Sequence, residues 1–104
     1  MKIVIAGAGD MGTHLAKMLS GNGHDITVAD VDPKALAELG SLVDVETTEG
    51  DTTQFSVLRK AGVRKCDLFI AVRSVENDNI RSAVMAKQLG ARKAIARVDS
   101  NEYL

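Results

Sequence analysis

Residues 2–12 read KIVIAGAGDMG, an apolar run followed by three glycines in the spacing G-x-G-x-x-G. The run 2–6 is short and almost wholly apolar, which is typical of a strand buried on both faces. Residues 11–19 carry apolar side chains at helical spacing, so the glycines join a strand to a helix. In that setting the glycines permit a tight turn, close approach of a pyrophosphate and close helix packing. We therefore predict a phosphate-binding turn; a glycine-rich turn that binds nothing is the alternative.

The rest of the chain alternates strands with helices. Further strands are expected at residues 25–30, 42–47, 67–72 and 93–98. Further helices are expected at residues 33–39, 53–61 and 75–89, stopped by Gly40, Gly62 and Gly90, with Asp32 and Ser74 as amino-terminal caps. Strands joined by helical crossovers run parallel. The pattern predicts an α/β fold, a Rossmann-like doubly wound parallel sheet of order 3-2-1-4-5 that lacks the usual sixth strand. We expect residues 1–104 to form one domain cut from a longer chain.

The amino-acid composition excludes several classes of protein. The chain has 104 residues, 45% hydrophobic and 26% charged, which is typical of one small globular domain and excludes a disordered or fibrous protein. Apolar stretches are far shorter than the ~20 residues that cross a bilayer, and no signal peptide is evident, so we expect a cytosolic protein. The net charge of -1 argues against nucleic-acid binding. One cysteine excludes an internal disulfide, and no zinc-binding spacing is present.

An acidic residue closes the second expected strand. Asp30 follows Gly12 by 18 positions, where this kind of turn places the carboxylate that accepts hydrogen bonds from a ribose. A carboxylate there repels a 2′-phosphate, so NAD(H) or an adenine nucleotide is favoured over NADP(H). Asp32 could act in the same way, but its position before Pro33 favours a helix cap.

Three more residues are candidates for the same site. Asp51 comes after the third strand and could reach an adenine edge, although an ordinary turn is an equal alternative. Arg73 follows the fourth strand and could pair with a phosphate or a partner's acid, or be solvated. Arg97 lies within the expected fifth strand, where it would be a phosphate ligand if it faced the crevice and solvated if it lay at the sheet edge.

The other reactive residue types form no catalytic pattern. His14 and His24 have no acid or nucleophile nearby in sequence, so we expect both at the surface. Cys66 is expected to be a small, half-buried residue rather than a reactive thiol. Tyr103 is poorly placed for catalysis.

The longest expected helix has more apolar surface than one stripe needs. Its apolar residues form two adjacent stripes, Ile80, Ala83 and Val84, and Met85, Ala86 and Leu89. Either the helix is deeply buried, or the second apolar face meets another subunit. The fifth strand would also leave an open sheet edge, so we expect self-association.

The order of these motifs resembles a known family. They are Gly7–Gly12 (GAGDMG), Asp30 closing strand two, Gly50-Asp51-Thr52, Asn79-Ile80 and Ala96-Arg97-Val98. Together they resemble the nucleotide-binding N-terminal domain of the Trk/Ktr potassium-uptake regulators, the KTN or RCK-N domain, over essentially all 104 residues. The resemblance implies a non-catalytic, cytosolic regulatory domain that binds NAD(H), or ATP or ADP, at the inner face of the cell membrane. It implies homodimers or rings beneath a membrane-embedded potassium translocation subunit, and no nucleic acid.

The resemblance also implies a set of site residues. The implied nucleotide-binding residues are Gly7, Ala8, Gly9, Asp10, Met11, Gly12, Asp30, Val31, Asp51, Thr52, Ala71, Val72, Arg73 and, more weakly, Arg97. The family often has a threonine and paired acids after the fourth strand, whereas residues 73–78 here read RSVEND. We expect the C-terminal ligand-sensing domain of the family to lie outside these 104 residues. The alternatives are the cofactor-binding half of an NAD-dependent oxidoreductase and an assembly domain with a degenerate pocket.

Overall fold

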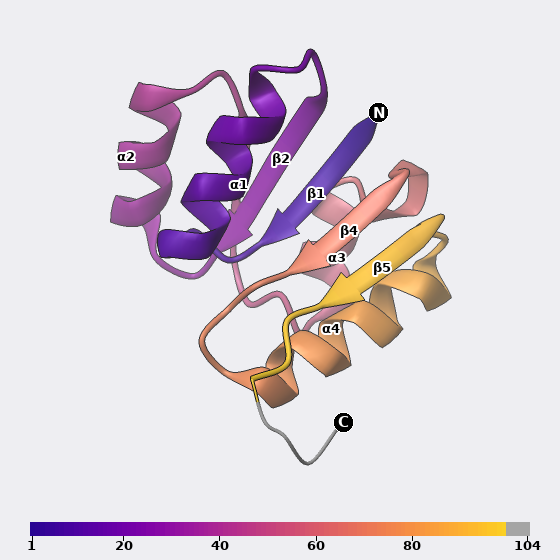
Figure 1. Ribbon diagram of the computed structural model, residues 1–104. Coiled ribbons are helices and arrows are strands. Elements are labelled where there is room, and N and C mark those ends of the chain that lie inside the picture. The colour runs from indigo at the N-terminus through magenta and orange to yellow at the C-terminus, as the bar shows by residue number, and fades with distance from the viewer. Residues whose placement is uncertain (100–104) are drawn as a thin grey trace.

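Five parallel strands form a single sheet in a computed structural model that describes residues 1–99 (Figure 1). Tyr103 lies outside the described residues. The strands are β1 (Lys2–Ala6), β2 (Asp25–Asp30), β3 (Glu46–Glu49), β4 (Leu68–Ala71) and β5 (Lys93–Ala96). Their order is β3-β2-β1-β4-β5, and every neighbouring pair is parallel, which confirms the predicted topology. The sheet therefore changes winding direction between β1 and β4, where such folds bind ligands.

Helices cover both faces of the sheet (Figure 1). On one face lie α1 (Asp10–Ser20) and α2 (Pro33–Leu42), and on the other lie α3 (Phe55–Lys60), the 3-10 turn η1 (Val63–Lys65) and α4 (Glu76–Leu89). Asp32 caps α2 as predicted, because its side chain accepts hydrogen bonds from the backbone N–H groups of Lys34 and Ala35. Among residues 1–99, no helix is long and apolar enough to cross a membrane.

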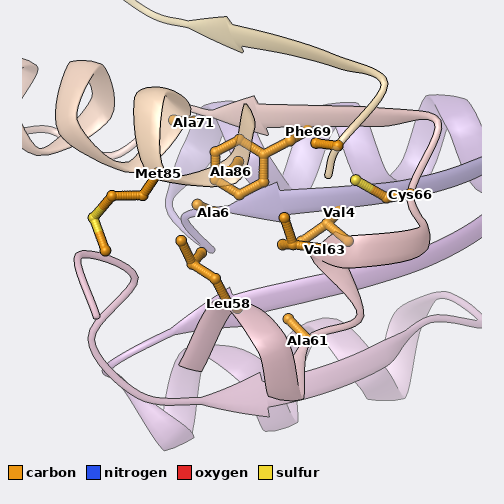
Figure 2. Packing of buried hydrophobic residues seen from close by; sticks show 12 residues of the cluster. Val4, Ala6, Leu58, Ala61, Val63, Cys66, Phe69, Ala71, Met85 and Ala86 are labelled. Carbon is orange, nitrogen blue, oxygen red and sulfur yellow. The ribbon is translucent and has the colours of Figure 1, made fainter. Parts of the chain in front are cut away.

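The core is aliphatic with one central ring. Figure 2 shows Phe69 of β4 beside Ala86 of α4, with Leu58 and Val63 in the same cluster. Phe69 is fully buried, and the small alanines let α4 lie close to the sheet. A fully buried side chain of this size contributes roughly 2–3 kcal/mol to folding through the hydrophobic effect.

The third strand begins later than predicted. Helix α2 continues through Gly40 to Leu42, and β3 occupies Glu46–Glu49 instead of residues 42–47. Gly40 lies inside the helix with open space around its α-carbon, so it neither needs a left-handed conformation nor ends the helix. The alternation of apolar residues near position 43 was therefore wrongly assigned to a strand.

The N-cap residue and the buried face of α4 differ from the prediction. Val75, not Ser74, occupies the N-cap position, and no side chain caps the helix. The buried face combines Met85 and Ala86 with polar residues, while Val84 is 53% exposed. Deep burial of the whole helix is therefore wrong. Strand β5 also ends at Ala96, two residues earlier than expected, and is an edge strand.

Candidate functional site

Two of the three motif glycines are required by the protein's own packing. Gly7 ends β1 with a φ of +125°, a conformation that side-chain-bearing residues rarely adopt. A Cβ on Gly12 would lie 1.7 Å from the carbonyl oxygen of Gly7, so only glycine lets α1 approach the end of β1 this closely. These two positions therefore position the turn, as the motif predicts.

The middle glycine has no such role. Gly9 has a φ of -76°, which any residue can adopt, and a Cβ there would meet no atom within 4 Å. The residue is exposed and occupies the N-cap of α1 without a side-chain cap. The first helical hydrogen bond runs from Thr13 N–H to Gly9 C=O (2.9 Å), so the amides of Asp10, Met11 and Gly12 precede it. A glycine here leaves free the space that an anion needs to reach the positive end of a helix.

Asp30 joins the glycine turn to the end of β2. Its Oδ2 accepts a hydrogen bond from Ala8 N–H at 2.7 Å, and its Oδ1 accepts one from Asp32 N–H at 2.9 Å. Each carboxylate oxygen has a second lone pair, so the group can still accept hydrogen bonds from two hydroxyls. Val31 follows with 48% of its surface exposed and puts an apolar side chain at this rim.

A cleft of about 200 Å³ opens where the ends of β1, β2 and β4 meet. Its lining comprises Gly7, Gly9, Asp30, Val72, Arg73 and Ser74. The structure thus brings together five residues that the sequence predicted for one site. Ser74 is an addition, because the sequence pattern suggested a helix cap. The Arg73 guanidinium lies 3.2 Å from Asp78 Oδ2 in an ion pair, so it could bind a phosphate only by sharing or exchanging that partner.

Asn79 fixes the backbone on the far side of this cleft. The residue is 1% exposed, and its Oδ1 accepts a hydrogen bond from Arg73 N–H at 2.8 Å. Its Nδ2 donates to the carbonyl of Arg73 (2.8 Å) and to that of Arg97 (3.2 Å). One buried amide from α4 therefore holds the segments that follow β4 and β5 together. The apolar spacing of α4 did not signal this role, because Asn79 shares the buried face with Ser82, Met85 and Ala86.

The two residues predicted in the turn after β3, Asp51 and Thr52, have different surroundings. Asp51 Oδ1 accepts hydrogen bonds from the hydroxyl (2.6 Å) and the N–H (2.9 Å) of Thr53, which together hold the pKa of Asp51 below its usual value. Arg73 and Arg81 add a weaker electrostatic contribution in the same direction. Thr52, by contrast, is 1% exposed, and its hydroxyl has no partner within the part of the chain that the structure describes. Its side chain points into the fold and not to the solvent.

Two other predicted residues lie away from the cleft. Ala71 is fully buried in the cluster around Phe69, and its carbonyl accepts a hydrogen bond from Arg97 N–H. Arg97 follows β5, is exposed, and pairs with Asp99 at 3.1 Å. The geometry at Arg97 is that of a solvated ion pair and does not form part of the cleft lining.

His24 and Cys66 do not line this cleft, whereas His14 lines a neighbouring hollow together with Gly9 and Asp10. His14 is exposed on α1, and His24 Nδ1 lies 3.1 Å from the amino group of Met1. Cys66 is 3% exposed, more buried than predicted, and burial raises the pKa of its thiol. Within residues 1–99 no group of three His, Cys, Asp or Glu side chains could hold a metal ion.

Structural comparison supports the fold assignment. The NAD(P)-binding domain of an exopolyphosphatase-related protein from Archaeoglobus fulgidus superimposes with a TM-score of 0.83 at 18% identity, over 96% of this chain and 74% of the other. The Kef CTD of Shewanella denitrificans in its AMP-bound form superimposes with a TM-score of 0.75 at 21% identity, over 91% and 57%. At these identities the comparisons show a shared Rossmann-like fold.

Sequence comparison assigns the family. The Trk system potassium uptake protein TrkA homolog of Archaeoglobus fulgidus is 40% identical over 104 residues, which is all of this chain and 23% of that protein. The chain thus spans about a quarter of that relative's length. The family model of the TrkA-N domain matches residues 3–104. The chain therefore belongs to the TrkA-N domain family, as the motifs in its sequence predicted.

Proposed function

We propose that this chain is the nucleotide-binding regulatory domain of a potassium uptake system. The observation that carries the proposal is Gly9, a glycine that the fold does not need, at the uncapped start of α1 and within the cleft at the winding reversal of the sheet. The name of the similar Trk system protein from Archaeoglobus fulgidus supports the link to potassium uptake.

The proposed ligand is NAD(H), with ATP and ADP as the other candidates. The amides that begin α1 would bind the phosphates, because they carry the positive end of the helix dipole. Asp30 would accept hydrogen bonds from the ribose hydroxyls, and its negative charge would repel the 2′-phosphate of NADP(H). Val31 and the turn at Asp51 would lie beside the adenine. Ala71 would support the cleft from within the core. Arg97 is a weaker candidate for contact with the nucleotide.

The domain would act by binding and not by catalysis. Asp30 and Arg73 are the ionisable side chains of the cleft lining within residues 1–99, and both already have partners in the protein. Neither is placed as a free general acid or base. A bound nucleotide would bridge the ends of β1, β2 and β4 and would favour whichever arrangement of the assembly binds it more tightly.

The proposed setting is a homodimer or ring in the cytoplasm, at the inner face of the cell membrane. There it would contact a membrane-embedded potassium translocation subunit, with no nucleic acid involved. The half-exposed Val84 on α4, the half-exposed Ile95 on β5 and the open edge at β5 support self-association.

Thermal denaturation with NAD⁺, NADH, NADPH, ATP and ADP tests the proposal. A ligand at 100 times its dissociation constant adds roughly 2.7 kcal/mol to the free energy of unfolding. For a domain of this size the melting temperature would rise by roughly 10 °C or more. We expect such a rise with NAD(H) or with ATP or ADP, and a smaller one with NADPH. The absence of any rise would contradict nucleotide binding, and steady oxidation of NADH with a candidate substrate would favour the oxidoreductase alternative.

A further inference from the structure

The positive charges of this chain are unevenly distributed, although its net charge is only -1. Eight of the thirteen lysines and arginines gather where β1, β4 and β5 begin, at the opposite edge of the sheet from the glycine turn. We call this group the basic rim; it comprises Lys2, Arg59, Lys60, Arg64, Lys65, Lys87, Arg92 and Lys93. All are exposed except the partly buried Lys2.

Backbone contacts bring parts of the basic rim close together. Lys2 C=O accepts a hydrogen bond from Asp67 N–H, and Asp67 C=O accepts one from Lys93 N–H, so Asp67 lies between two of the lysines. On the other side, a Cβ on Gly90 would lie 3.0 Å from the carbonyl oxygen of Arg64. The end of α4 therefore reaches η1, and residues distant in sequence share one surface.

Part of the basic rim is hollow. A depression of about 470 Å³ is lined by Lys2, Arg59, Gly62, Arg64, Lys65 and Leu89. Its cations come from the start of β1, the end of α3 and η1, which places four positive charges around one concave space. The volume lies within the ~300–1,000 Å³ range of small-ligand sites.

These cations have no carboxylate partner in residues 1–99. The two ion pairs of this part of the chain, Arg73–Asp78 and Arg97–Asp99, lie at the opposite edge of the sheet. Asp67 accepts a hydrogen bond at its Oδ2 from the backbone N–H of Lys2, and Asp25 and Glu46 line an adjoining hollow with Lys2 and Lys60. Clustered like charges repel and lower the stability of the fold. The arrangement therefore opposes folding, which favours a role in binding.

We propose that the hollow in the basic rim binds a multiply charged phosphate-bearing anion. Four cations exceed what one carboxylate can neutralise, whereas linked phosphates match that charge. Arginine presents its N–H groups as a fork that fits phosphate oxygens, and lysine adds point charges. The anion can be a free polyphosphorylated molecule or the phosphates of lipid headgroups. The five residues of β1 separate this site from the glycine turn by about 16 Å.

Nuclear magnetic resonance of the ¹⁵N-labelled chain tests this proposal with sodium tripolyphosphate as the probe. We expect saturable shifts of the amides of Gly62, Arg64 and Lys65, with an affinity that falls severalfold between 50 and 200 mM salt. Prior addition of NADH does not remove these shifts if the site is separate from the cleft. Shifts confined to the glycine turn would overturn the proposal, and so would the absence of any shift.

A matched pair of variants distinguishes binding in the hollow from non-specific attraction of the anion to positive charge. Arg64→Gln/Lys65→Gln removes two charges from the hollow, and Lys17→Gln/Lys34→Gln removes two charges from α1 and α2. We expect the first variant to weaken tripolyphosphate binding at least tenfold and the second to change it less than twofold. Without ligand, the first variant should also melt at a higher temperature in low salt, because it relieves repulsion. Equal loss of binding in both variants would overturn the proposal.

Two further probes identify the chemistry and source of the anion. Cosedimentation with phosphatidylglycerol vesicles but not with phosphatidylcholine vesicles, lost in Arg64→Gln/Lys65→Gln, would assign the phosphate to lipid headgroups. Tripolyphosphate binding without cosedimentation would assign it to a free anion. If poly-glutamate shifts the amides of the hollow and tripolyphosphate does not, the surface binds an acidic protein segment and phosphate recognition is wrong.

Discussion

Asp30 Oδ2 lies 2.7 Å from the N–H of Ala8, so the carboxylate proposed to bind a ribose also holds the glycine turn in place. Its Oδ1 accepts a second hydrogen bond from Asp32 N–H. Because the ribose acceptor and the shape of the turn depend on one side chain, a change at Asp30 alters both binding and stability.

Replacement of Asp30 therefore destabilises the protein even without a nucleotide. Asp30→Ala leaves two backbone N–H groups without their acceptor, which costs about 1–3 kcal/mol when the groups are shielded from water. Urea denaturation of the ligand-free protein measures the effect. Asp44→Ala removes the same charge from an exposed loop position and should change stability by less than about 0.5 kcal/mol. A ligand-free Asp30→Ala variant as stable as the unaltered protein would contradict the structural role.

Asn79 provides a second structural test. Asn79→Leu still fills the buried space with a side chain. It removes the hydrogen-bond partners of the Arg73 N–H and C=O and of the Arg97 C=O. We expect a loss of about 2–4 kcal/mol, since buried polar groups without partners are costly. Asn77→Ala, at an exposed position of the same helix, is the control and should be nearly neutral. Equal unfolding midpoints for the two variants would show that the bridge contributes little.

Replacement of Thr52, unlike that of Asn79, should not lower the stability of the protein. Its hydroxyl is buried and without a partner among residues 1–99, so Thr52→Val replaces it with a methyl group of similar shape at no loss of a hydrogen bond. We expect stability to be unchanged or higher by up to about 1 kcal/mol. Thr13→Val is the comparison, because Thr13 Oγ1 donates to the carbonyl of Ala8 and its removal should cost roughly 1 kcal/mol. A clear loss in Thr52→Val would reveal a hydrogen-bond partner.

The lowered pKa of Asp51 predicts that the stability of the protein depends on pH. Hydrogen bonds from Thr53 lower the pKa of Asp51 in the folded state below its usual value of 3.8. The ionised carboxylate therefore adds stability that is complete above the unfolded-state pKa and is lost as the pH falls through the folded-state pKa. The difference in unfolding midpoint between the unaltered protein and Asp51→Asn should be largest at pH 7 and should shrink below pH 3.8. A difference independent of pH would assign the effect to packing.

The strong local signals in the sequence predicted most of the fold. Strands β1 and β2 occupy the predicted residues, because continuous apolar runs between turn residues have few alternatives. Gly40 shows the limit of such signals: a glycine can end a helix or lie inside one, and only the packing of Leu39 and its neighbours decides. The exposed Val84 and the buried Asn79 show the same limit for α4, since apolar spacing alone does not reveal which face meets the sheet.

The candidate site was predictable where chain order determines geometry. Parallel strands bring Gly7, Asp30 and Arg73 to one edge of the sheet, so a correct topology places them together. Contacts that depend on side-chain direction were not predictable. The bond from Ala8 to Asp30, the burial of Thr52 and the pairing of Arg97 with Asp99 arise from packing that residue order does not specify.

The proposed site requires that Gly9 is a glycine because a nucleotide occupies the space beside it. Calorimetric titration of NADH and of ADP into the unaltered protein and Gly9→Ala tests this directly. Gly40→Ala is the control, because a Cβ at either glycine meets no atom within 4 Å. We predict that Gly9→Ala stays folded and loses at least tenfold in affinity, while Gly40→Ala binds normally. Equal affinity in all three proteins, or no binding by the unaltered protein, would contradict nucleotide binding beside Gly9.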